Sequence, residues 1–95
     1  MLRPGVYKEE TMEKQWAVYI LECKDGTLYT GITDDLERRI KAHNEGKGAK
    51  YTRGRGPVRL RYREDCESHS AALRRELAVK RLSRQEKLAL IGEND

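Results

Sequence analysis

The sequence predicts a mixed α/β fold of the α+β type, in which helices flank one three-stranded, mainly antiparallel sheet in the order β-β-α-β-α-α. Two β-rich runs joined by a glycine-containing turn indicate a hairpin. A later segment alternates apolar and basic residues, and capping patterns precede segments with helical periodicity. A chain of 95 residues can bury one modest core, so we expect a single domain.

The first two strands are predicted at residues 16–23 and 28–32, where β-branched and aromatic side chains dominate. The turn between them leaves two registers open. A two-residue turn at Asp25-Gly26 pairs Tyr19 with Ile32 and puts Tyr19 and Tyr29 on opposite faces. A three-residue loop with a glycine bulge pairs Tyr19 with Gly31 and puts both tyrosines on one face.

The first predicted helix has Asp34 as its N-cap and Glu37 three residues later, and it stops near Gly46 and Gly48. Its inward face is predicted to carry Leu36, Ile40 and His43, with Arg39 beside them.

Residues 47–57 contain three glycines and no hydrophobic repeat, which predicts a basic loop. Strict alternation over residues 58–63 predicts a half-buried strand with three arginines on its other face. A second helix is predicted from Ser68 to Leu82. The capping box Ser83-Arg84-Gln85-Glu86 predicts the start of a third, ending near Gly92.

The basic charge is concentrated in one part of the chain. The net charge is +4, yet residues 38–63 hold ten Lys or Arg and one acid, Glu45, and the remainder sums to −5. A solvated face usually mixes both signs, so this concentration favours a polyanion partner such as nucleic acid.

Composition also excludes several classes of protein. No apolar run approaches the roughly 20 residues of a membrane helix, and residues 1–15 lack the apolar segment of a secretory signal. We read residues 1–15 as a flexible extension, and Met12 as an equally good start. Cys23 and Cys66 are too few for a disulfide framework or a structural zinc site, so we expect a reducing cytoplasm and two buried free thiols, with a Cys23–Cys66 disulfide as the alternative. We also expect a monomer.

Two of the predicted helices carry candidate residues for chemistry. Arg39 and His43 are four residues apart near an inward face, where an arginine needs an anion, either a buried carboxylate or a ligand. Glu76 falls on a helical arc with Ala72, Leu73, Leu77 and Val79. A carboxylate there needs either a metal or the salt-bridge partner that Lys80 offers one turn later.

These residues together resemble the GIY-YIG nuclease superfamily, and most closely its small stand-alone YhbQ-like (UPF0213-type) bacterial members. The resemblance covers roughly residues 16–90 and is carried by Val18-Tyr19-Ile20-Leu21, Leu28-Tyr29-Thr30-Gly31-Ile32-Thr33, Glu37-Arg38-Arg39, His43-Asn44, Gly48-Ala49-Lys50-Tyr51-Thr52 and Ala72-Leu73-Arg74-Arg75-Glu76. It implies a GIY-YIG-like domain at residues 16–92 with both tyrosines at one site, which favours the bulged hairpin loop.

The resemblance implies a metal-dependent endonuclease that hydrolyses DNA phosphodiester bonds. Glu76 matches the carboxylate that holds one divalent ion, Mg²⁺ or Mn²⁺. Tyr19 matches the general base, and its pKa of about 10 has to be depressed by nearby positive charge for that role. Tyr29 matches the tyrosine that orients water or phosphate, Arg39 matches the transition-state arginine, and His43 matches a histidine that assists the first tyrosine in some members. The Asn or Gln that the family usually carries downstream is not evident in this sequence, and Lys80 is the residue we expect in comparable space.

The basic loop then acquires a role in binding nucleic acid, most simply DNA. We expect Lys47, Lys50, Arg53 and Arg55 to follow the phosphate backbone and Tyr51 to stack on a base. The alternatives to a nuclease that acts alone are a non-catalytic nucleic-acid-binding module and a nuclease subunit whose specificity comes from a protein partner.

Overall fold

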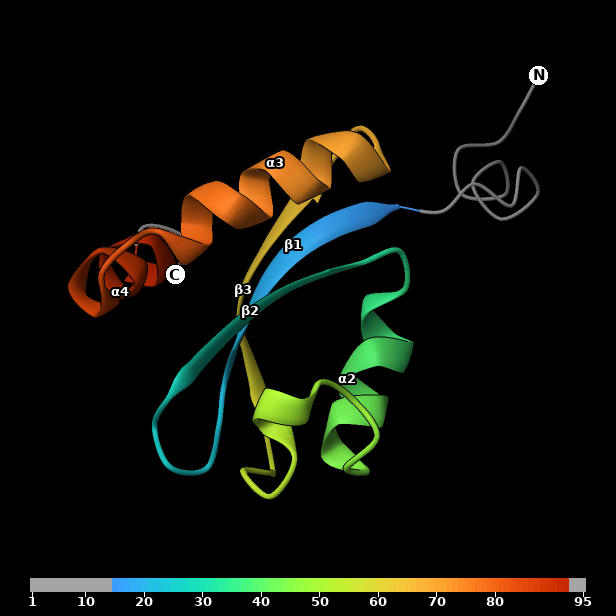
Figure 1. The fold of residues 1–95 in the computed structure, drawn as a ribbon, viewed down its shortest axis with the longest axis vertical. Helices are drawn as coiled ribbons and strands as arrows, with labels where there is room; N and C mark the ends of the chain where they lie inside the picture. The colour runs from blue at the N-terminus through green and yellow to red at the C-terminus, as the bar shows by residue number, and fades with distance from the viewer. Residues whose placement is uncertain (1–14, 93–95) are drawn as a thin grey trace.

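The computed structural model describes residues 15–92 and confirms the expected α+β fold, with one sheet of strand order β2-β1-β3 in which both pairs are antiparallel. Of the extension expected at residues 1–15, all but Gln15 lies outside the described residues. The elements are β1 (Trp16–Glu22), β2 (Leu28–Thr33), α2 (Leu36–Asn44), the 3₁₀ turn η1 (Lys50–Thr52), β3 (Arg59–Cys66), α3 (His69–Lys80) and α4 (Arg84–Gly92) (Figure 1).

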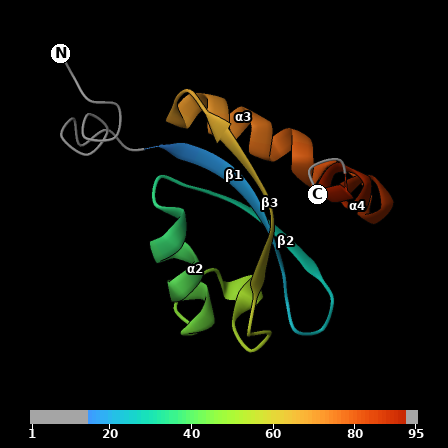
Figure 2. The ribbon, with the colours of Figure 1, turned by 180° about the vertical axis from the view of Figure 1, so that it is seen from behind.

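The sheet lies between two layers. Helix α2 and the turn η1 lie on one side of the sheet, and α3 and α4 lie on the other, as Figures 1 and 2 show from opposite directions. Each face has its own cluster of buried side chains. The α2 face buries Tyr19, Leu21, Cys23 and Val58, and the other face buries Val18, Ile20, Tyr62, Ala72, Val79 and Ile91. The central strand β1 therefore supplies both cores, because its side chains alternate between the faces.

The hairpin adopts the three-residue loop, which settles the register. Gly26 has a φ of +85°, and the N–H of Cys23 donates to the carbonyl of Thr27 across 2.9 Å. Tyr19 pairs with Gly31, and Leu21 pairs with Tyr29. Because paired residues point to the same side of a sheet, Tyr19 and Tyr29 share the α2 face.

The first helix begins one residue later than predicted. Its N-cap is Asp35 rather than Asp34, because the Asp35 carboxylate accepts a hydrogen bond from the backbone N–H of Arg38. The backbone N–H of Asp35 is in turn held by the Thr33 hydroxyl across 3.1 Å. Residues Leu36, Ile40 and His43 face the sheet as predicted.

The strict alternation predicted for residues 58–63 is interrupted. A register shift in the β1–β3 pairing makes Ile20 the partner of Tyr62 and Leu21 the partner of Leu60, which leaves Arg61 as the extra residue of a bulge. Val58 and Tyr62 consequently belong to opposite cores, and Leu60 is 41% exposed.

The two C-terminal helices start where their capping patterns predict. The Ser68 hydroxyl caps α3 by accepting from the N–H of Ala71. Ser83 and Glu86 form the reciprocal capping box at α4, with distances of 2.8 and 3.1 Å. The apolar arc expected on α3 is narrower than predicted. Only Ala72 and Val79 are buried, whereas Leu73 and Leu77 are 42% and 56% exposed, which puts Glu76 at the margin of the buried face.

The two cysteines are free thiols, as expected. Cys23 is buried in the α2-side core, and Cys66 packs against the core on the opposite face.

Candidate active site

Gly31 makes room for the phenol of Tyr19. A Cβ added at Gly31 would lie 2.7 Å from the Tyr19 hydroxyl oxygen and 3.0 Å from Cε2 of Tyr29. The Tyr19 ring therefore lies across β2 at its partner position, where only glycine leaves space for it. The group that approaches the sheet closely at Gly31 is thus the Tyr19 side chain.

The Tyr19 hydroxyl begins a buried chain of hydrogen bonds. Its oxygen lies 3.0 Å from Nε2 of His43, and Nδ1 of His43 lies 2.7 Å from Oγ1 of Thr52. The Thr52 hydroxyl donates its own proton to the carbonyl of Ala49 across 2.9 Å. Tyr19, His43 and Thr52 are each at most 1% exposed. Water is therefore excluded from these hydrogen bonds.

These hydrogen bonds fix the protonation state of His43. Because the Thr52 proton goes to Ala49, Thr52 Oγ1 accepts the hydrogen bond from Nδ1–H of His43. Nε2 is then the unprotonated nitrogen of the neutral ring, and the Tyr19 O–H donates to it. The hydrogen bonds therefore run in one direction, with Tyr19, His43 and Thr52 as successive donors and the Ala49 carbonyl as the last acceptor.

A second glycine supports the histidine. A Cβ at Gly48 would overlap Nδ1 of His43 and would lie 2.7 Å from its Cγ and 2.8 Å from its Cε1. The backbone at Gly48 thus packs directly on the imidazole face. Neither Gly48 nor Thr52 was assigned a role from the sequence, although both lie in the Gly48–Thr52 segment that carries the family resemblance.

An aromatic row connects this buried chain with the surface. The ring centroid of Tyr29 lies 5.3 Å from His43 and 5.8 Å from Tyr51, which stacks on it at an interplanar angle of 26°. Tyr29 is half-buried and Tyr51 is 42% exposed. The Arg55 guanidinium lies 4.4 Å from the centroid of the Tyr51 ring. Tyr29 is therefore the tyrosine through which a ligand at the surface can reach the site.

The predicted set converges electrostatically on Tyr19. The groups that act on its hydroxyl are Arg39, which hydrogen-bonds it and lowers its pKa, and Tyr29 and Glu76, which raise it. Arg39 lies on α2 and Glu76 on α3, on opposite sides of the sheet, and the charges of both act on the Tyr19 hydroxyl. The family resemblance implies that Tyr19, Tyr29, Arg39 and Glu76 form one site, and this stays a prediction.

The expected depression of the Tyr19 pKa is wrong for this structure. Burial is the dominant influence, and it raises the pKa of Tyr19 to about 12 despite Arg39. Burial, together with the positive charge of Arg39, lowers the pKa of His43 below its ordinary value. At neutral pH Tyr19 is therefore a protonated donor and His43 a neutral acceptor.

Glu76 adopts the salt bridge that the sequence offered as the alternative to a metal. Its Oε2 lies 3.2 Å from Nζ of Lys80, and the two side chains are 16% and 49% exposed. Among residues 15–92, no group of three or more His, Cys, Asp or Glu side chains is arranged to hold a metal ion.

The predicted nucleic-acid-binding residues divide into two groups. Lys50, Tyr51 and Arg53 are exposed on or beside η1. Arg55 is instead paired with Asp25 of the hairpin turn across 2.7 Å, and Lys47 lies 4.0 Å from Glu45. Arg55 thus ties the basic loop to the hairpin, and its charge is already balanced.

Known proteins connect this site with a family. The family model of the GIY-YIG catalytic domain matches residues 15–89, a span that contains Tyr19, Tyr29, Arg39 and Glu76. This chain belongs to the GIY-YIG family. Membership makes the GIY-YIG domain described above a nuclease-type domain and implies interaction with nucleic acid.

Close relatives share most of the chain. A UPF0213 protein of Halobacterium salinarum is 59% identical over 73 residues, covering 77% of this chain and 95% of the relative. A UPF0213 protein of Desulfotalea psychrophila is 52% identical over 91 residues, covering 95% of this chain and 83% of the relative.

Two solved structures support the same fold for this GIY-YIG domain. The solution NMR structure of the UPF0213 protein BH0048 from Bacillus halodurans is 56% identical and matches with a TM-score of 0.54 over 82% of this chain and 83% of that one. The solution NMR structure of EF2693 from E. faecalis is 39% identical, with a TM-score of 0.58 over 86% and 88%. Within residues 15–92, no helix is long and apolar enough to span a membrane.

Proposed function

We propose that this protein is a metal-dependent endonuclease that hydrolyses DNA phosphodiester bonds. The observation that carries the proposal is the cluster of Tyr19, Tyr29 and His43 on the α2 face of the sheet. Arg39 and Glu76 lie near enough to this cluster to act on the pKa of Tyr19. A guanidinium, two phenols and one carboxylate are the groups that phosphoryl transfer needs for charge stabilisation, proton transfer and metal binding. The family match supports the reaction class.

Each residue has a role that follows from its surroundings. Arg39 offers a planar set of donors for phosphate oxygens. Tyr29, half-buried at the end of the aromatic row, positions the phosphate or the attacking water. Tyr19 acts as the base once its proton has passed to Nε2 of His43, which lies 3.0 Å away.

This proton transfer is uphill in the resting protein. Burial raises the pKa of Tyr19 to about 12 and lowers the pKa of His43 below its ordinary value, so the proton stays on Tyr19. Added positive charge beside Tyr19 reduces the cost of the transfer. We infer that Tyr19 stays protonated until substrate and cation assemble at the site.

The residues present fit one Mg²⁺ or Mn²⁺ ion. Mg²⁺ is commonly held by one or two carboxylates, waters and substrate phosphates rather than by an all-protein cage. Glu76 supplies one carboxylate, which would have to leave Lys80 to bind the ion. When bound, the cation neutralises phosphate charge and stabilises the leaving oxygen.

The test is a cleavage assay with a matched pair of variants. Wild-type protein is incubated with Mg²⁺ or Mn²⁺ and with single-stranded, duplex and branched DNA. Glu76→Gln should abolish cleavage, and Glu67→Gln, which makes the same change at an exposed position, should retain it. Cleavage that persists in purified Glu76→Gln would refute the mechanism. Absence of cleavage by the wild type with every substrate and metal would refute the function.

The second candidate is a non-catalytic nucleic-acid-binding module. Two observations favour it. Glu76 is paired with Lys80, and the raised pKa of Tyr19 keeps its hydroxyl protonated, so neither group is in the state that catalysis requires. This candidate predicts salt-sensitive DNA binding and no cleavage with any metal. Cleavage that appears only after addition of cell extract would indicate the partner-activated nuclease instead.

A further inference from the structure

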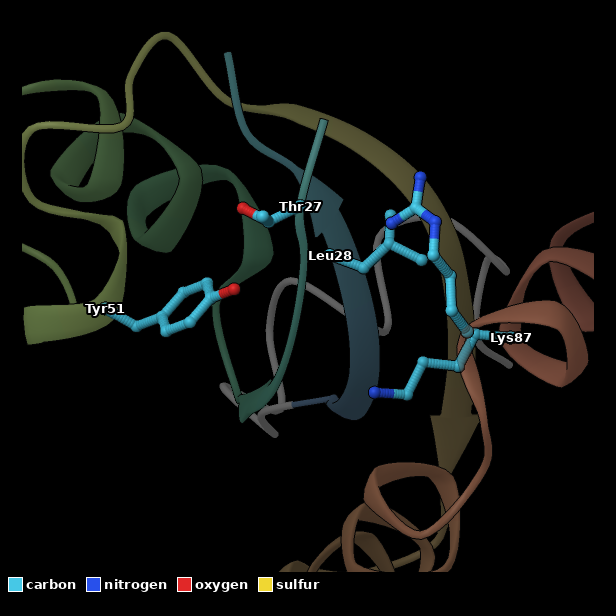
Figure 3. A pocket seen from close by; sticks show the side chains of 5 residues that line it. Thr27, Leu28, Tyr51 and Lys87 are labelled. Carbon is cyan, nitrogen blue, oxygen red and sulfur yellow. The ribbon is translucent and has the colours of Figure 1, made fainter. Parts of the chain in front are cut away.

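Two adjoining hollows follow the open edge of β2. The first is lined by Thr27, Leu28, Tyr51, Arg84 and Lys87 (Figure 3), and the second by Leu28, Tyr29, Thr30, Tyr51, Lys80 and Lys87. They share Leu28, Tyr51 and Lys87, so they form one groove that leads from the hairpin turn to Tyr29. Their volumes are about 180 and 290 Å³, below the roughly 300–1,000 Å³ usual for small-molecule pockets. An extended chain lying across the edge suits this shape better than an enclosed ligand does.

The two walls of the groove differ in chemistry. Figure 3 shows Tyr51 on one side of β2 and Lys87 on the other, with Thr27 and Leu28 between them. The η1 side is aromatic. The α3–α4 side is cationic and is formed by Lys80, Arg84 and Lys87. The charge pattern of the sequence indicated no binding residue on α4, because Arg84 and Lys87 lie outside the basic segment of residues 38–63.

Charge on the α4 side is available to an anionic ligand. Arg84 and Lys87 have no ion-pair partner among residues 15–92, whereas Arg59 and Arg61 both pair with Glu22. The groove floor also contains an unsatisfied polar group, because the buried Oγ1 of Thr30 has no hydrogen-bond partner within the described part of the chain. A phosphate or sugar oxygen in the groove would offer it an acceptor.

The opposite wall suits an unpaired base. Tyr51 is 42% exposed and extends the stack that begins at Tyr29, with the Arg55 guanidinium beside its ring. Aromatic rings and arginine planes stack on bases only where the bases are unstacked from their own duplex. A nucleotide that contacts both walls of one hollow must therefore have its base turned away from its phosphate and out of a helix.

We propose that the β2-edge groove, formed by the residues of these two hollows, binds a single unpaired nucleic-acid strand and leads it to Tyr29. Phosphates contact Arg84 and Lys87, and a base stacks beside Tyr51. This proposal rests on the proposed function and names its substrate class, a single strand or an unpaired end rather than a continuous duplex. Lys80 joins the two regions, because it lines the groove and pairs with Glu76.

Binding without a metal tests the groove separately from catalysis. A labelled oligodeoxynucleotide of about 12 nucleotides and a duplex of the same sequence are titrated in EDTA at several salt concentrations. The groove variant is Arg84→Gln with Lys87→Gln. The charge-matched control is Arg63→Gln with Arg74→Gln, on β3 and the exposed surface of α3.

The groove variant should bind the single strand about tenfold more weakly, and its log–log salt slope should fall by about 1.4, since each lost phosphate contact contributes about 0.7. The control should keep the wild-type slope. Tyr51→Leu should weaken binding about tenfold with its slope unchanged. Equal losses in the groove variant and the control, or equal losses for single strand and duplex, would overturn the proposal.

The outcomes separate the two proposals. Loss of binding in the groove variant, together with no cleavage by the wild type, leaves the groove standing and refutes the nuclease. If the groove variant binds and cleaves as the wild type does and Glu76→Gln is inactive, the groove proposal is refuted and the nuclease proposal stands. Glu76→Gln itself should bind the single strand at least as tightly as the wild type, because Glu76 lines neither hollow and its loss frees Lys80 for a phosphate.

Discussion

Replacing Thr52 by valine should both destabilise the protein and change the tautomer of His43. The substitution keeps the β-branched shape but removes the hydroxyl that accepts from Nδ1–H of His43. Ala49 keeps a partner, because its carbonyl also accepts from the backbone N–H of residue 52 across 3.0 Å. One buried donor is therefore left unpaired, which costs about 1–3 kcal/mol. That corresponds to about 4–8 °C in Tm for each kcal/mol in a domain of this size.

Urea unfolding and ¹⁵N NMR of the imidazole are the assays. The wild type should show protonated Nδ1 and bare Nε2. Thr52→Val should lose stability by the amount above and shift His43 toward the Nε2–H tautomer, which instead donates to Tyr19. Thr52→Ser keeps the hydroxyl and is the control, with the wild-type tautomer. A wild-type His43 protonated at Nε2, or a Thr52→Val protein as stable as the wild type, would refute the hydrogen-bond order.

Three further predictions concern the same site. Because the pKa of His43 is lowered by folding, the unfolded protein binds more protons than the folded protein below about pH 6.5. The free energy of unfolding should therefore rise with pH up to about 6.5 and then level off. His43→Gln should flatten this rise when the free energy of unfolding is measured across acid pH. Gly31→Ala and Gly48→Ala should each cost about 1–3 kcal/mol in denaturant unfolding through overpacking, whereas Gly92→Ala, with nothing within 4 Å, should change it by less than about 0.5 kcal/mol. Tyr19→Phe should leave the phenolate absorbance at about pH 10 unchanged, because Tyr19 ionises near 12; a lost tyrosine signal there would show that Tyr19 ionises normally.

The charge pattern was visible in the sequence, but its distribution in space was not. Residues 38–63 carry nine net positive charges. The fold brings acids from the first hairpin against several of them, with Asp25 pairing Arg55 and Glu22 pairing Arg59 and Arg61. Lys50 and Arg53 remain exposed without such pairing among the described residues. Tertiary contacts thus reduce the free charge on the basic segment, while α4 adds cations that the linear pattern did not connect with it.

Local signals determined the elements of this protein. Capping boxes, turn glycines and side-chain periodicity depend on neighbours within a few residues, so they predicted the order of strands and helices and the bounds of α3 and α4 closely. The bulge at Arg61 was beyond such signals, because it depends on how β3 aligns with β1. The choice between Asp34 and Asp35 as N-cap likewise depended on a contact with Thr33 that spacing did not specify.

The sequence by itself determined the fold class and, through motif resemblance, the set Tyr19, Tyr29, Arg39 and Glu76. Only the tertiary structure decided the hairpin register that puts both tyrosines on one face. It also decided the burial that keeps Tyr19 protonated and the Thr52 hydrogen bond that fixes the protonation state of His43. The physical reason is that residue types and spacing are properties of the chain, whereas pKa values and hydrogen-bond order depend on which distant groups exclude water and meet in the folded state.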